Sequence, residues 1–201
     1  MAISINIAVE DDLSHAVLAE MLRQTRRGFD VAVCYKQNGY GYLKKNLPAF
    51  LHASSIKPFI ILVDLDVNPC AATLADLWLG QLAKLPKTAL FRVAVKEVES
   101  WVLADSKSLA GFMGVREKEL PTNPDLLDDP KGFLVQVAQK SRYPTIQNSM
   151  VPAVGSRANV GPYFTRTLVQ FVRNHWEAKK ALSHSDSFRR AWNAVNNFKP
   201  N

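Results

Sequence analysis

Hydrophobic residues in the first hundred positions follow the two periods that distinguish strands from helices. From Ile3 to Val9 every second residue is isoleucine or valine, the spacing of a strand with one buried face. The segment Pro58–Val63 is apolar throughout, which is typical of a central parallel strand buried on both faces. Shorter apolar segments predict two further strands, at Asp30–Tyr35 and Leu90–Val95.

Apolar residues at helical spacing separate these strands. They predict one helix that begins at Asp11 or Asp12, a second over about Tyr42–His52, a third capped by Thr73 and a fourth that begins near Glu97. Strands and helices that alternate at such intervals form βαβ units. We therefore expect an α/β fold, with a mostly parallel, Rossmann-like sheet flanked by helices.

The pattern changes after Leu120. Three prolines interrupt residues 121–130 and predict a loop. Helical spacing follows over 131–140, 163–182 and 186–197. The sequence thus predicts an α/β domain at 1–120 and a helical, basic C-terminal part at 121–201, packed on the first.

Composition indicates a globular chain with a core. Hydrophobic residues make up 47% of the 201 residues, which argues against disorder. The longest apolar run, Phe59–Val63, is far shorter than the roughly 20 residues of a membrane span. No signal peptide is recognisable, and two isolated cysteines exclude a disulfide framework. We expect a cytoplasmic protein that has no contact with membranes.

The charge of the chain is divided unevenly along its length. Residues 1–130 carry 14 Lys and Arg against 16 Asp and Glu, whereas residues 131–201 carry 11 against 2. A basic surface of this kind attracts nucleic acid, DNA or RNA, although a solvated helix face gives the same pattern. The candidate nucleic-acid contacts are Lys44, Lys45, Arg166, Arg173, Lys179, Lys180, Arg189 and Arg190.

Acidic residues follow three of the predicted strands. Glu10 follows the first, Asp64 and Asp66 the third, and Glu97 and Glu99 the fourth. Ligands of open α/β sheets bind beyond the carboxyl ends of the strands. Carboxylates so close together need a cation or a raised pKa to coexist, and Mg²⁺ prefers oxygen ligands. The sequence therefore predicts a site for Mg²⁺, or for Mn²⁺, at this edge.

Three segments carry a resemblance to a known family. Val9-Glu10, Asp64-Leu65-Asp66 and the stretch Glu97–Asp105 resemble the Toprim fold, the catalytic domain of topoisomerases, DnaG-type primases and overcoming-lysogenization-defect nucleases. The chain looks most like the small stand-alone Toprim-like proteins of bacteria. The resemblance implies metal-dependent phosphodiester chemistry on nucleic acid, as a nuclease or in phosphotransfer, and an association with defence against phage and plasmids.

The same resemblance assigns roles to four acids. Glu10 would act as general acid or base, or as a metal ligand, and Asp64 and Asp66 would hold Mg²⁺. Glu99 would be a further ligand or a site-shaping acid.

Two positions depart from the Toprim pattern. Asp11 stands where many members have glycine, and Ser14 and His15 stand where the nuclease branch has another carboxylate. The loss of that acid leaves open a catalytically inactive Toprim-like module that binds nucleic acid or a partner protein, or that forms a homo-oligomer.

A phospho-receiver domain is a second alternative. Val9–Asp12 and Ile61–Asp64 resemble a response regulator, with Asp64 as phosphoacceptor and Asp11 and Asp12 as ligands of Mg²⁺. No Ser or Thr ends the fourth strand, where Ala94–Lys96 stands, and no fifth strand that ends in Lys-Pro follows. Asp66 would also have no role in a receiver.

Overall fold

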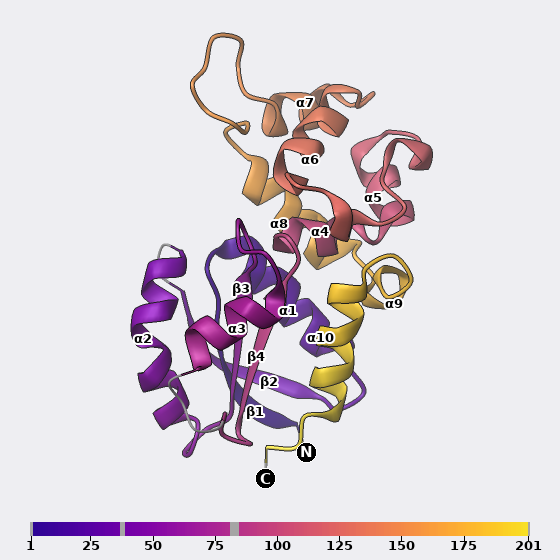
Figure 1. Ribbon diagram of the computed structural model, residues 1–201. Coiled ribbons are helices and arrows are strands. Elements are labelled where there is room, and N and C mark those ends of the chain that lie inside the picture. The colour runs from indigo at the N-terminus through magenta and orange to yellow at the C-terminus, as the bar shows by residue number, and fades with distance from the viewer. Residues whose placement is uncertain (1, 37–38, 81–84, 201) are drawn as a thin grey trace.

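A four-stranded parallel sheet forms the centre of the protein, whose computed structural model describes residues 2–36, 39–80 and 85–200 (Figure 1). The strand order is β2-β1-β3-β4. The strands are β1 (Ile3–Ala8), β2 (Phe29–Tyr35), β3 (Phe59–Asp64) and β4 (Ala89–Ala94). All four predicted strands are confirmed to within one residue at each end, as is the α/β fold with a parallel sheet.

The direction of the strand connections reverses between β1 and β3. From β1 the chain crosses to β2 on one side, and afterwards to β3 and β4 on the other. The register pairs Asp64 with Ala94, so β3 and β4 end at the same height, whereas Ala8 at the end of β1 pairs with Ile61. In open α/β sheets such a reversal opens a crevice at the carboxyl ends of the strands.

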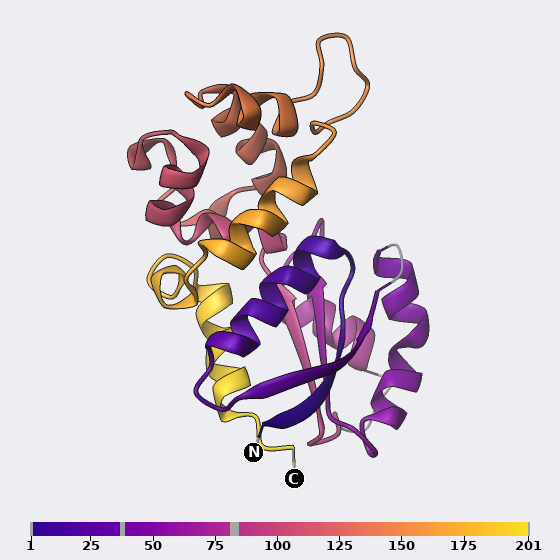
Figure 2. The same ribbon diagram turned by 180° about the vertical axis from the view of Figure 1, so that it is seen from behind.

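Helices cover both faces of the sheet (Figures 1 and 2). Alternate residues of β3 divide between two hydrophobic clusters, with Ile60 and Leu62 in one and Ile61 and Val63 in the other. The cluster around Ile60 contains residues of α1 (Asp12–Gln24), α8 (Phe164–Asn174) and α10 (Asp186–Asn197). The cluster around Ile61 contains residues of α2 (Tyr40–Ala53) and α3 (Ala71–Leu79).

A helical lobe lies beyond the carboxyl edge of the sheet (Figure 1). Its main helices are α5 (Ser106–Met113), α6 (Pro130–Gln139) and α7 (Pro144–Met150), and α4 (Val98–Leu103) leads into it from β4. Two short 3-10 turns lie between α5 and α6: Glu117–Glu119, and Pro124–Leu126 within the proline-rich stretch. This lobe places α6 above the ends of the strands.

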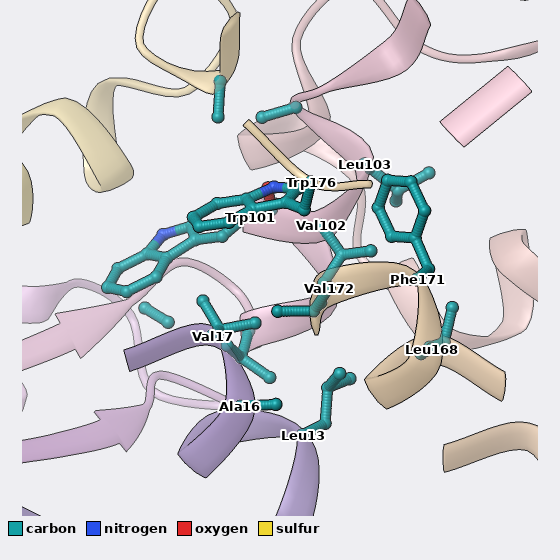
Figure 3. Close-up of a cluster of buried hydrophobic side chains, with 14 of the residues drawn as sticks. Leu13, Ala16, Val17, Trp101, Val102, Leu103, Leu168, Phe171, Val172 and Trp176 are labelled. Atoms are coloured by element: carbon teal, nitrogen blue, oxygen red, sulfur yellow. The ribbon is translucent and has the colours of Figure 1, made fainter. Parts of the chain in front are cut away.

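The C-terminal helices share the core of the sheet domain. Trp101 of α4 and Trp176 are both buried, and their rings lie 5.3 and 5.2 Å from the Phe188 ring of α10. Figure 3 shows both tryptophans beside side chains of α1 and α8. Trp101 Nε1 donates a hydrogen bond to Ser187 Oγ, 2.9 Å away. Residues 164–198 therefore pack on the sheet domain and have no separate core of their own.

Two expectations about helix ends are wrong. Thr73 does not cap α3, because the helix begins at Ala71 and the Cys70 thiol accepts the Thr73 N–H. The predicted helix over 163–182 is broken between α8 and α9 (Ala178–Ala181). At the break, side chains from distant parts of the sequence accept hydrogen bonds from the backbone. Asp105 accepts the N–H of Glu177, and Gln24 accepts the N–H of Ala178.

The helices of the described residues are short. The longest, α2, has 14 residues. In the part of the chain that the structure describes, none has the length and apolar character needed to cross a membrane.

The shared core gives a prediction about stability. Leu168 of α8 is fully buried in the cluster that also contains α1 and α4. Leu168→Ala should lower the free energy of unfolding by about 2–5 kcal/mol, because a cavity forms in a packed core. Val154, which is exposed, provides the control, and Val154→Ala should change it by less than about 0.5 kcal/mol.

Urea denaturation followed by far-UV circular dichroism and tryptophan fluorescence measures both variants. We expect a single unfolding transition, at the same urea concentration in both signals, because the helices and the sheet share one core. Two separate transitions, with only one shifted in Leu168→Ala, would contradict the shared core.

Candidate active site

A cavity of about 310 Å³ lies at the carboxyl edge of the sheet, where the strand order reverses. Residues that follow all four strands line it, together with one lysine of α6. Six of them are acids and two are lysines. The lining residues are Glu10, Asp11, Asp12, Lys36, Gly39, Asp64, Asp66, Glu97 and Lys131.

Two hydrogen bonds connect the ends of β1, β3 and β4. Glu10 Oε1 accepts the backbone N–H of Asp64, with 2.9 Å between the heavy atoms. Asp64 Oδ1 in turn accepts the backbone N–H of Val98, also at 2.9 Å, at the start of α4. Each carboxylate is thereby fixed by the backbone of the next strand end, and each keeps its second oxygen for another partner.

Asp66 adopts a backbone conformation that is uncommon for residues other than glycine. Its φ of 49° lies in the left-handed region, which aspartate tolerates better than most residues. Its N–H donates to Lys96 O at 3.1 Å, so the turn after β3 is attached to the segment after β4. This turn places the exposed Asp66 at the same cavity as Glu10 and Asp64.

The two glutamates after β4 occupy different places. Glu97 precedes α4 and lines the cavity, whereas Glu99, within α4, is 2% exposed and does not. Lys131 Nζ lies 3.4 Å from Glu99 Oε1 and 3.9 Å from Glu97 Oε1. Lys131 is thus held by two carboxylates beside Asp64, and the charge pattern of the sequence gave no sign of it.

Burial raises the pKa of four acids in or beside the cavity. It raises the pKa of Asp64 well above its usual value, and the charges of Glu99 and Glu10 add to the effect. Burial is also the main reason that the pKa of Glu10 and that of Glu97 are raised. It raises the pKa of Glu99 to about 7, even though Lys131 opposes the shift. Without a bound cation, this cluster therefore binds protons more readily than free carboxylates do.

The remaining acids of the cavity already have partners. Asp11 caps α1 and accepts both the N–H and the hydroxyl of Ser14 at 2.8 Å, so the helix begins where the sequence predicts. Asp12 pairs with Lys36. His15 does not line the cavity, and its pKa is lowered by burial and by Lys36 and Arg173, which favours the neutral ring.

The candidate nucleic-acid contacts are spread over several surfaces. Lys44 and Lys45 are exposed on α2, with the Lys44 ammonium 5.7 Å from the centre of the Tyr40 ring. Lys180 pairs with Glu177, and both Arg189 and Arg190 pair with Asp186. Arg166 and Arg173 line a cavity next to the acidic one, and Lys179 lines a further cavity that also contains Arg173.

The donor set suits a hard cation with few protein ligands. Glu97 Oε2 is buried and has no hydrogen-bond partner among the described residues, the kind of atom that an ion or a water satisfies. Within residues 2–36, 39–80 and 85–200, no three Asp, Glu, His or Cys side chains are arranged to hold a metal by themselves. Mg²⁺ often takes one or two carboxylates and completes its shell with water and substrate phosphate. The residues present fit that mode of binding.

The raised pKa values give a prediction about pH. An acid whose pKa is higher in the folded state than in the unfolded chain destabilises the fold as pH rises through that interval. For Glu99 the interval runs from 4.5 to about 7. Glu99→Gln should therefore increase the free energy of unfolding above pH 7, by at most about 3 kcal/mol, in metal-free buffer.

Urea denaturation of the wild type and Glu99→Gln at several pH values between 4 and 8 measures this effect. The difference between the two proteins should grow from pH 4.5 to 7. Glu177→Gln, which changes an exposed glutamate, is the matched control. A difference that is constant over the whole range would contradict the raised pKa.

Comparison of the chain with protein-family models, with curated proteins and with solved structures found no match. The fold is an α/β fold with a parallel, Rossmann-like sheet. Any assignment of chemistry to the site therefore depends on its geometry and on the residues that form it.

Proposed function

We propose that the protein carries out metal-dependent phosphodiester chemistry on nucleic acid, as a Toprim-type nuclease or phosphotransferase. One observation carries the proposal: Glu10, Asp64, Asp66 and Glu97 meet in a single cavity at the reversal point of the sheet. A concentration of carboxylates in a partly buried position suits a divalent cation that neutralises it. The Toprim resemblance of the same residues supports the choice of reaction.

Asp64, together with Asp66 or Glu97, would hold Mg²⁺ or Mn²⁺. When bound, the ion would stabilise the charge that develops on the phosphate oxygens during the reaction. Asp64 is well suited because the Val98 N–H fixes its Oδ1, so that the side chain is already oriented. Asp66 is exposed and reaches the same cavity from the turn after β3.

Glu10 is the proposed general acid or base. Its Oε1 is engaged by the Asp64 N–H, which leaves Oε2 to exchange a proton with the attacking or the leaving oxygen. Burial raises its pKa towards the pH at which such transfer is most efficient.

Lys131 supplies a positive charge at the cavity, whereas the acid that the nuclease branch of the Toprim family has at the position of Ser14 or His15 is absent. Glu99 and Glu97 hold its ammonium in place. Burial alone would lower the pKa of this lysine, but Glu99, Glu97 and Asp64 raise it, so that it remains charged. A fixed ammonium beside the carboxylates can bind a non-bridging phosphate oxygen and would stabilise charge there in addition to a single metal ion.

The receiver alternative receives less support from the geometry. A receiver would need Asp11 and Asp12 for its metal ion, but Asp11 caps α1 and Asp12 pairs with Lys36. The inactive binding module uses the same cavity and differs only in having no turnover. The experiments below distinguish both alternatives from the proposed reaction.

The proposal predicts which variants lose activity. Glu10→Gln and Asp64→Asn should each lower Mg²⁺-dependent cleavage of a mixture of single- and double-stranded DNA and RNA by at least about 100-fold. Asp76→Asn, which changes an exposed acid of α3, should cleave like the wild type. Cleavage is followed on denaturing gels, and thermal unfolding verifies that each variant is folded.

Other outcomes would decide against the proposal. Cleavage that persists in both variants would remove the catalytic assignment. Stable phosphorylation of Asp64 by acetyl phosphate, unaffected by Asp66→Asn, would make the protein a receiver. Binding of Mn²⁺ by the wild type without any cleavage would favour the inactive module.

A further inference from the structure

We infer that the groove between α1 and α8 binds a single strand of nucleic acid and leads it into the acidic cavity. The inference rests on the proposed function, because it gives the cavity its substrate and a direction of approach. Helices α1 and α8 lie side by side, with α8 on the side of the helical lobe (Figure 2).

Shared lining residues place the groove next to the acidic cavity. Asp12 lines both the acidic cavity and a second cavity of about 520 Å³, which also contains Arg166 and Arg173. Arg173 in turn lines a third cavity of about 450 Å³ at the far ends of α1 and α8, which contains Lys179. The three hollows thus follow one another along the two helices.

The charges along this path favour a polyanion. Arg166 and Arg173 stand seven positions apart on α8, which places them on one face of the helix. Both, like Lys179, are exposed and form no ion pair within the described residues. The acids on the path are already neutralised, since Lys36 pairs with Asp12 and Arg23 pairs with Glu20.

Three other basic residues of the C-terminal part are neutralised, whereas Arg142, Arg157 and Lys199 are exposed without an ion pair among the described residues but line none of the three cavities. Asp186 neutralises Arg189 and Arg190 on α10, and Glu177 neutralises Lys180. Of the unpaired bases after residue 131, those that line the path of cavities therefore lie on α8 and the segment that follows it.

The lining of the second cavity suits an unpaired strand better than a duplex. Val160, Pro162 and Val169 give it apolar surface between the arginines. Tyr163, next to Pro162 in sequence, is 56% exposed, and an exposed aromatic ring offers a base a surface for stacking. Alternation of cationic and apolar or aromatic surface is typical of proteins that bind single strands.

Binding of a fluorescein-labelled 12-nucleotide oligothymidylate tests the inference, with EDTA present so that no cleavage occurs. The double variant Arg166→Ala/Arg173→Ala should bind about tenfold more weakly in dilute salt. The slope of log K against log salt should fall in magnitude by about 1.4, since each lost phosphate contact on a single strand contributes about 0.7.

The matched control removes two lysines at the opposite edge of the sheet. Lys57 and Lys87 precede β3 and β4, and Lys57→Ala/Lys87→Ala changes the net charge by the same amount. This control should bind within about twofold of the wild type. Equal weakening in both double variants would overturn the inference, because only the net charge would then matter.

Two further results would also overturn it. One is the absence of oligonucleotide binding by the wild type in dilute salt. The other is a 12-base-pair duplex that binds as tightly as the single strand through the same two arginines, which would make the ligand a duplex.

The test is independent of catalysis. Glu10→Gln should retain oligonucleotide binding in EDTA. An arginine-dependent affinity without cleavage by the wild type in Mg²⁺ would support the groove and contradict the proposed reaction. Cleavage without arginine-dependent binding would support the proposed reaction and contradict the groove.

Discussion

The site depends on two hydrogen bonds that connect carboxylates at one strand end to the backbone of the next. The Asp64 N–H donates to Glu10, and the Val98 N–H donates to Asp64. Acids that are partly buried at the edge of a sheet lose hydration. Hydrogen bonds, protonation or a bound cation must compensate for the free energy that this loss costs. Here a backbone N–H donates a hydrogen bond to one oxygen of each carboxylate. The raised pKa values of Glu10 and Asp64 indicate that this bond compensates for only part of the lost hydration. A bound cation would compensate for the rest of the lost hydration.

The helical part of the chain contributes residues to the cavity and to the groove. Through Lys131, α6 brings one positive charge into the cavity, and Glu97 and Glu99 hold it there. The apolar side of α8, which includes Leu168 and Phe171, packs in the core, while Arg166 and Arg173 lie on its exposed side. The same helix therefore stabilises the fold and provides the charged side of the groove.

The sequence predicted the framework well because its signals are local. Strands appeared as period-two or continuous apolar segments, and the carboxyl ends of parallel strands must meet at one edge. This sufficed to place Glu10, Asp64 and Asp66 together. It did not suffice to separate Glu97 from Glu99, because which of them lines the cavity depends on where α4 begins.

Other features depend on contacts between distant parts of the chain. Lys131 reaches the site only through the packing of the helical lobe, and no pattern around residue 131 indicates it. The break between α8 and α9 arises because Asp105 and Gln24 accept backbone N–H groups from far along the sequence. The pairing of Arg189 and Arg190 with Asp186 was in contrast readable from their spacing of three and four residues.

The most direct test of the central claim is the position of Mn²⁺ in a crystal of the wild-type protein, located by its anomalous scattering. The account predicts one ion in the cavity, coordinated by Asp64 and by Asp66 or Glu97, with Glu10 beside it. A crystal in which that cavity contains no Mn²⁺ at millimolar concentration, while Lys131 and the carboxylates bind only one another, would contradict it.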